Sequence, residues 1–362
     1  IPDSEVTGVQ TCALPICPLS LLLLFICLSC TRDVILKLDP APPVLVLNAS
    51  VTPEREVAAF LSKSWFLLDS VPEYDLPEEG VKVDVYVNET FRGTMQRSDD
   101  PADSTAYKGQ FRLPGCHVQA GDKVRLEAQA PGFDPVKGET IIPSKTDILS
   151  LDTASVITSD YSSARTRIYL TLKDDPSVRN YYRLVVERLV EYRKGDKVMW
   201  VSSFNDNWGD SVISGDSVEV VIVSYDFRLV YDDPAFQQGI PSPALEEYDG
   251  TYCRGVLSDE MFDGKEYTLT SSFFPESSFK NDSIDVIVHY DIHLMSISEA
   301  YYNYLKKIRG FSISLGDAFL DGLLEPTAVY SNVTDGFGVV TGYQISTRRL
   351  TMPFGDRTHV WY

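Results

Sequence analysis

The stretch that decides the fold class is Val81-Lys82-Val83-Asp84-Val85-Tyr86-Val87. Its side chains alternate strictly, and a period of two residues is typical of a strand with one buried face. The alternation predicts a strand whose valine and tyrosine side chains share one face. Similar runs lie on both sides, separated by turn residues such as Pro114-Gly115 and Pro131-Gly132. Residues 40–143 are therefore expected to form an Ig-like antiparallel sandwich.

A second, larger β domain is expected over residues 150–362, where the β-branched and aromatic runs are longer. Residues 181–192 and 197–204 are expected to pair as a hairpin, and 284–297 to form one long strand. The fold class that follows is all-β, with two antiparallel β-sandwich-like domains.

One short helix is expected in the second domain, over residues 298–309. Ser296 and Glu299 have the spacing of a capping box, and apolar residues then recur at the helical period. Basic residues follow near the C-terminal end, and Gly310 offers a stop. The aromatic stripe of this helix favours core packing over a ligand-binding face.

The first 29 residues are not expected to take part in the fold. Residues 1–16 resemble the translation of a sequencing adapter, and the chain starts at Ile1 without a Met. A genuine disordered leader is the alternative. Residues 17–29 then resemble a truncated signal peptide, because their apolar run is shorter than the roughly 20 residues that span a bilayer.

Cys30 is expected to carry a lipid. Leu28-Ser29-Cys30 resembles a bacterial lipobox, in which a small residue precedes a Cys that is acylated and becomes the mature N-terminus. Cys27 stands where Leu is usual, and an ordinary signal peptide is the alternative. Residues 30–39 would then be a tether, holding the body to the outer membrane of a Gram-negative envelope by the lipid. Which face of that membrane it occupies stays open.

The charge and the cysteines limit the partners. A net charge of -20 argues against nucleic acid or an anionic membrane surface, since both need a basic face. Of the six Cys, Cys116 and Cys253 lie in the expected folded body. A disulfide is permitted in that compartment, but the two fall in different expected domains, which favours two independent buried thiols.

The sequence carries no motif that indicates catalysis: no nucleophile elbow, metalloprotease helix, phosphate loop or dinucleotide fingerprint. The chain is therefore not expected to be an enzyme, and no catalytic residue, cofactor-binding residue or cofactor is assigned. A catalytic carboxylate pair, as in a glycosidase, stays open because such a pair leaves no local signature.

The sharpest constellation of possible metal ligands is His289-Tyr290-Asp291-Ile292-His293. Alternate residues of a strand face one way, so the two histidines and the aspartate would line one face. The histidines would lie about 13 Å apart, too far for one ion. We therefore expect the polar face of a half-buried strand and assign no metal site.

Several stretches together carry a family resemblance: 30–39; 174–176 with 180–184; 258–265; and 297–302 with 330–343. Their order and spacing resemble the bacterial outer-membrane lipoprotein family catalogued as domain of unknown function 4249. Members are often encoded beside TonB-dependent receptors, the energised outer-membrane importers. The resemblance implies a lipid-anchored binding or accessory protein, associated with such an importer. A structural or assembly lipoprotein without a small ligand is the alternative, and a glycan-acting enzyme is a weaker one.

Overall fold

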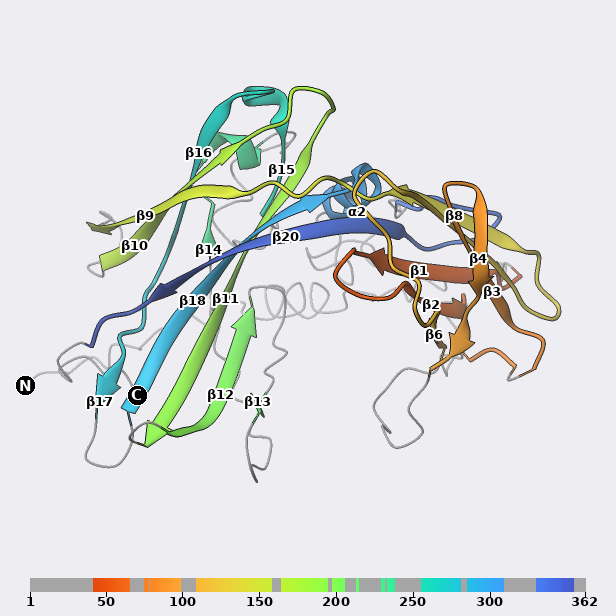
Figure 1. The fold of residues 1–362 in the computed structure, drawn as a ribbon, viewed down its shortest axis with the longest axis horizontal. Helices are drawn as coiled ribbons and strands as arrows, with labels where there is room; N and C mark the ends of the chain where they lie inside the picture. Colours follow the sequence, from red (N-terminus) through yellow and green to blue (C-terminus); the bar gives the residue numbers. More distant parts are fainter. Residues whose placement is uncertain are drawn as a thin grey trace, which may run out of the picture. The chain divides into compact units, whose positions relative to one another are not determined.

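The described part of the chain is built mainly of strands, which form three sheets (Figure 1). The computed structural model describes these residues: 42–65, 75–77, 79–98, 109–157, 164–194, 197–205, 213–214, 229–231, 233–237, 255–280, 285–308 and 330–354. Nearly all strand pairs are antiparallel, so the predicted all-β, sandwich-like class is confirmed.

The fold-deciding stretch lies in a five-stranded sheet. In spatial order its strands are β19 (Val333–Thr334), β8 (Val136–Ile141), β7 (Lys123–Gln129), β3 (Lys82–Val87) and β4 (Thr90–Thr94). Val83, Val85 and Val87 of β3 are buried in a core cluster, as their alternation predicts. The prediction that Tyr86 shares their face is wrong. Residue 86 falls on the opposite face by the same period of two, where its ring lies under Arg125 at 4.1 Å.

The longest sheet runs through both halves of the sequence. Its path is β13 (Ile213–Ser214), β12 (Lys197–Asn205), β11 (Tyr181–Lys194), β18 (Asp285–Ile297), β20 (Val340–Thr351), β1 (Leu45–Val51), β2 (Ala58–Lys63), β6 (Gln110–Arg112) and β5 (Gln96–Arg97). Two short strands lie off this path: β15 (Val256–Ser258) on β11, and β17 (Phe279–Lys280) on β18. The expected hairpin is confirmed, since β11 pairs antiparallel with β12 from Lys194 and Lys197 onward.

A four-stranded sheet packs on the central strands of the long sheet. Its order is β14 (Leu229–Val230), β16 (Glu266–Phe273), β10 (Ala164–Lys173) and β9 (Ile148–Ile157). Ile168 and Leu170 of β10 share one core cluster with Tyr182 of β11 and Tyr290 of β18. The two sheets therefore bury their apolar faces against each other, as sandwich sheets do. Two short 3-10 helices, η1 (Pro234–Gln237) and η3 (Asp259–Met261), lie in the connections.

Strand β20 joins segments that are distant in the sequence. It begins parallel to β1, with Ala49 opposite Val340, and continues antiparallel to β18, with Ile297 opposite Tyr343. Gly338, just before it, has a φ of +118° and lies so close to β1 that an added Cβ would be 2.0 Å from the Leu47 carbonyl oxygen. Only glycine permits that approach. The described residues from Pro43 onward fall in one compact unit, and the expected domain division after residue 143 stays a prediction.

The expected helix is present as α2 (Glu299–Ile308). Its cap differs from the predicted one: Ser298, not Ser296, accepts the hydrogen bond from the Tyr301 amide, at 3.4 Å. Ser296 is still in β18, where its hydroxyl accepts from the Thr146 amide at 3.1 Å. Capping-box spacing identified the helix but placed its N-cap two residues early, at Ser296 instead of Ser298. Among the described helices, none has the length and apolarity needed to cross a bilayer.

Candidate functional site

The expected lipid anchor lies outside the described residues. Cys30, the preceding 1–29 and the tether 30–39 are not described, and neither is Cys253, so these stay predictions from sequence. Cys116 is a buried free thiol, and burial raises its pKa. A thiol with a raised pKa is a poor nucleophile at neutral pH, which favours a packing role.

The two histidines singled out in the sequence form cross-strand contacts on β18. The Nδ1 atom of His289 lies 2.9 Å from the Thr351 hydroxyl, and its Nε2 lies 3.3 Å from Glu191. His293 repeats the arrangement with its own threonine and glutamate, at 2.8 and 3.4 Å: Thr347 and Glu187. Each imidazole therefore links β18 to β20 on one side and to β11 on the other.

Asp291 lies between the histidines and binds Arg349 of β20. Both carboxylate oxygens accept from the guanidinium, each at 2.7 Å, and Asp291 is itself buried. Hydrogen bonding to Asp291 raises the pKa of Arg349. The other face of β18 is apolar and buried, which confirms the expected inward side: Val288, Tyr290, Ile292 and Leu294. The constellation thus acts as a polar clamp across three strands.

Three carboxylates meet where β10 ends and η3 begins. Oxygens of Asp174, Asp259 and Asp263 all lie within 4.8 Å of one another. Asp174 and Asp259 are 2% and 3% exposed, so two carboxyl groups share a site that water barely reaches. Burial raises the pKa of Asp259, and the charges of Asp174 and Asp263 raise it further.

Hydrogen bonds tie these carboxylates to two loops. Asp174 accepts from the Tyr182 hydroxyl at 2.5 Å and from the Gly264 amide at 2.8 Å, and Asp259 accepts from the Asn180 amide at 2.5 Å. Such oxygens are ligands that hard cations favour. The hydrogen-bond partners named here are donors from the protein itself, so the arrangement acts as a loop clamp. Sequence reasoning missed it because its members lie in separate stretches.

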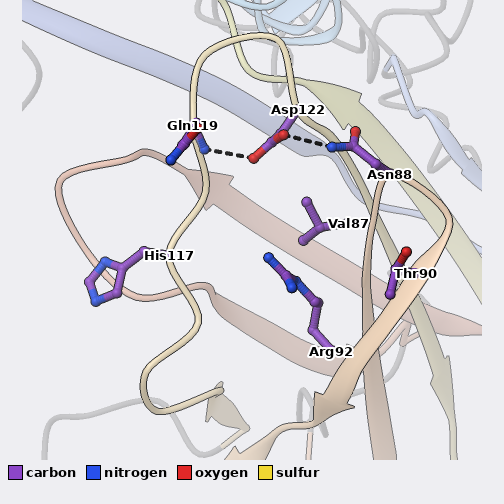
Figure 2. A pocket seen from close by; sticks show the side chains of 7 residues that line it. All are labelled: Val87, Asn88, Thr90, Arg92, His117, Gln119 and Asp122. Carbon is purple, nitrogen blue, oxygen red and sulfur yellow. Dashed lines mark hydrogen bonds between the residues drawn. The ribbon is translucent and has the colours of Figure 1, made fainter.

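A polar pocket of about 300 Å³ opens between the β3–β4 turn and the loop before β7 (Figure 2). Its lining is mostly hydrophilic: Val87, Asn88, Thr90, Arg92, His117, Gln119 and Asp122. The sequence carries no signal for this group, because its members lie in separate stretches and match no motif. We consider this pocket a candidate ligand site within the described part of the chain.

Two of the lining residues hold the walls of this pocket together. The Asn88 side-chain amide donates to Asp122 at 2.7 Å, and its oxygen accepts from the Lys123 amide at 2.9 Å. Asp122 also accepts from the backbone N–H of Gln119 at 2.7 Å. Asn88 and Glu89 have positive φ values of 51° and 62°, as a tight hairpin turn requires. The turn and the loop are therefore fixed relative to each other.

Comparison with known proteins gives one family match. A family model described as Domain of unknown function (DUF4249) matches residues 31–349. No curated protein matches the sequence. Among solved structures, the chain is similar to a β-glucuronidase of Parabacteroides merdae at 8% identity and a TM-score of 0.21, over 71% of this chain and 24% of that one. The chain thus spans about a quarter of that enzyme, and so low a likeness carries no argument.

Proposed function

The chain belongs to the family described as Domain of unknown function (DUF4249), and from that premise we propose that it is a lipid-anchored binding protein of the bacterial envelope. In this proposal it is not an enzyme and serves as an accessory of a TonB-dependent outer-membrane importer. The lipobox-like Leu28-Ser29-Cys30 supports the anchor, and the family resemblance supports the importer.

The observation that carries the proposal is where the resemblance-bearing stretches meet. Tyr181 pairs with Ser258 of β15 and with Ile297 of β18, so three of these stretches lie side by side in one sheet. The Tyr181 ring also packs against Tyr302 of α2 in a tilted arrangement, with ring centroids 4.6 Å apart. These stretches therefore pack on one another.

Residues 330–343, which the resemblance groups with 297–302, close the same junction. The Gly342 amide of β20 donates to the Ser298 hydroxyl at 3.0 Å, and the Ser298 amide donates to the Gly342 carbonyl at 2.8 Å. The described stretches that carry the resemblance thus form a framework of strands around α2. A shared framework with loops at its ends is typical of binding modules, whose loops carry the specific contacts.

Affinity capture tests the proposal. The chain from Cys30 onward, preceded by a lipoprotein signal peptide and given a C-terminal tag, would be expressed in a Gram-negative host that encodes the family, and captured from detergent-solubilised outer membrane. We expect a TonB-dependent barrel to co-purify and to be identified by mass spectrometry. Capture of other envelope proteins without any such barrel would support the structural-lipoprotein alternative instead.

A Cys30→Ala variant separates the anchor from the binding surface. It should leave the membrane fraction, because the lipid is the proposed attachment, yet still capture the barrel from detergent extract through protein contacts. Retention of the exported variant in the membrane would contradict the anchor. Loss of barrel capture by the exported variant would contradict a specific protein contact.

A further inference from the structure

We propose that the pocket of Figure 2 binds a small hydroxylated carboxylate, with Arg92 as the residue that pairs with the ligand's carboxylate. This goes beyond the proposed function, since an accessory could bind an importer with or without its own ligand. The ligand class includes acidic sugars and hydroxy acids, which share a carboxylate beside hydroxyl groups.

The division of tasks among the lining residues supports a ligand site. Asn88 and Asp122 hold the walls in place through their mutual hydrogen bond, which Figure 2 shows. The side chains of Thr90, Arg92 and Gln119 make no hydrogen bond or ion pair with any residue of the described chain. The braced walls therefore present a guanidinium, a hydroxyl and a carboxamide that are available to a ligand.

The charge of the pocket selects the ligand. The Asp122 carboxylate already accepts two hydrogen bonds, from Asn88 and Gln119, whereas the Arg92 guanidinium is unpaired among the described residues. The lining thus carries one guanidinium and one carboxylate, and of the two the guanidinium is the group that has no partner among the described residues. A guanidinium binds a carboxylate through two parallel hydrogen bonds, and the neutral amide and hydroxyl groups suit ligand hydroxyls.

The size of the pocket limits the ligand. Small-molecule pockets range from about 300 to 1,000 Å³, so this one, at about 300 Å³, fits a ligand of roughly one sugar ring. Rigid walls also help affinity, because fixing the turn and the loop in advance lowers the ordering cost of binding.

Calorimetric titration at low salt tests the proposal with galacturonate, citrate and galactose. Galactose has the hydroxyl groups of galacturonate but lacks its carboxylate. We expect galacturonate or citrate to bind saturably and galactose to bind at least tenfold more weakly.

Arg92→Gln should weaken binding of the carboxylate by about tenfold or more, as expected for one charge-assisted pair. Lys137→Gln, which removes an exposed charge from β8 of the same sheet, is the matched control and should bind as the wild type does.

Three outcomes would overturn the proposal: no saturable binding of either carboxylate, equal affinity for galactose and galacturonate, or wild-type affinity in Arg92→Gln. Arg92 is exposed, so its variant should keep the wild-type melting temperature. The same variant should still capture the importer. Failure of importer capture by the wild type would reject the proposed function while leaving the titration result as it stands.

Discussion

At the scale of single residues, the buried carboxylates are the groups for which carrying a negative charge costs the most free energy. Asp259 is 3% exposed and lies within 4.8 Å of Asp174 and Asp263. Its pKa is raised by burial and by its acidic neighbours. Because the folded-state pKa lies above the ordinary 3.8, a proton on Asp259 stabilises the fold at acidic pH, and this stabilisation is lost as the pH rises through the folded-state pKa.

Asp259→Asn should therefore increase the free energy of unfolding at pH 7, by on the order of 1 kcal/mol. The new amide oxygen can still accept from Asn180, and the repulsion with Asp174 disappears. The gain should shrink as the pH falls toward 3.8, the ordinary value for the unfolded chain. Urea unfolding across this range measures it, with the exposed Asp263→Asn as a control of smaller effect. A loss of stability, or a melting temperature that calcium ions raise in the wild type alone, would contradict the prediction.

Asp233 is also a buried carboxylate, but its neighbours are hydrogen-bond donors and not other carboxylates. It accepts from the Ala235 amide at 2.9 Å and the Tyr267 hydroxyl at 2.7 Å on Oδ1, and from the Thr270 amide at 3.1 Å on Oδ2. Burial, together with the hydrogen bond to Asp233, raises the pKa of Tyr267 to about 12.

Asp233→Asn should lower the free energy of unfolding by about 2–3 kcal/mol, since its amide group would face donors instead of accepting from them. Tyr267→Phe removes one of these bonds and should cost about 1 kcal/mol. Chemical denaturation gives both values, and Asp152→Asn on the exposed side of β9 should change little. Equal costs for the Asp152 and Asp233 variants would contradict the role of the donors.

At the scale of elements, the clamp on β18 decides how firmly three strands pair. Asp291 binds Arg349 through two bonds of 2.7 Å, and the aspartate side chain is 11% exposed against 52% for the arginine. The exposed half of the arginine is screened by water, so the stabilisation that the ion pair gives depends on the buried carboxylate.

Arg349→Ala should destabilise the fold by about 2–3 kcal/mol, because Asp291 stays buried without its partner. The double variant with Asp291→Ala should lose less than the two single variants added together, which a double-mutant cycle from urea unfolding reveals. Thr347→Val, which affects only the His293 contact on the same strand, is the control. Additive losses would mean that Asp291 and Arg349 do not interact energetically.

At the scale of the whole molecule, β20 couples the strands of residues 45–141 to those of 148–351. The Leu47 amide donates to the Phe337 carbonyl at 2.8 Å, and the Phe337 amide donates to the Leu45 carbonyl at 3.0 Å. Val333 and Val340 complete the core cluster of the first set of strands. Both sets should therefore unfold in one cooperative transition.

Gly338→Ala tests this coupling. The added methyl would meet the Leu47 carbonyl oxygen at 2.0 Å and force β1 and β20 apart, at a cost on the order of 3–4 kcal/mol. Gly121→Ala is the matched control, since its φ of +84° is also left-handed but nothing lies within 4 Å. It should cost about 1 kcal/mol. Calorimetry should show a single transition in the wild type and control, and two in Gly338→Ala. Two transitions in the wild type would instead support independent domains.

The sequence by itself determined the local elements, because a strand or helix records in its own period which side is buried. The alternation over 81–87 predicted β3, and the helical spacing after Ser298 predicted α2. The polar alternation of 289–293 predicted which side of β18 faces the core. Where it failed, at Tyr86 and at the cap Ser296, the error was one of face or of position within a correctly identified element.

Only the tertiary structure decided which distant segments meet. The hydroxyls of Ser50 and Thr341, 291 positions apart, are hydrogen-bonded to each other. The carboxylates of Asp174 and Asp259 come together from the end of β10 and the start of η3. The pocket around Arg92 likewise needs the β3–β4 turn and the loop before β7 to be fixed side by side. No local period encodes such contacts, because they depend on how sheets pack and which strands become neighbours, and that is settled by the burial of the whole chain.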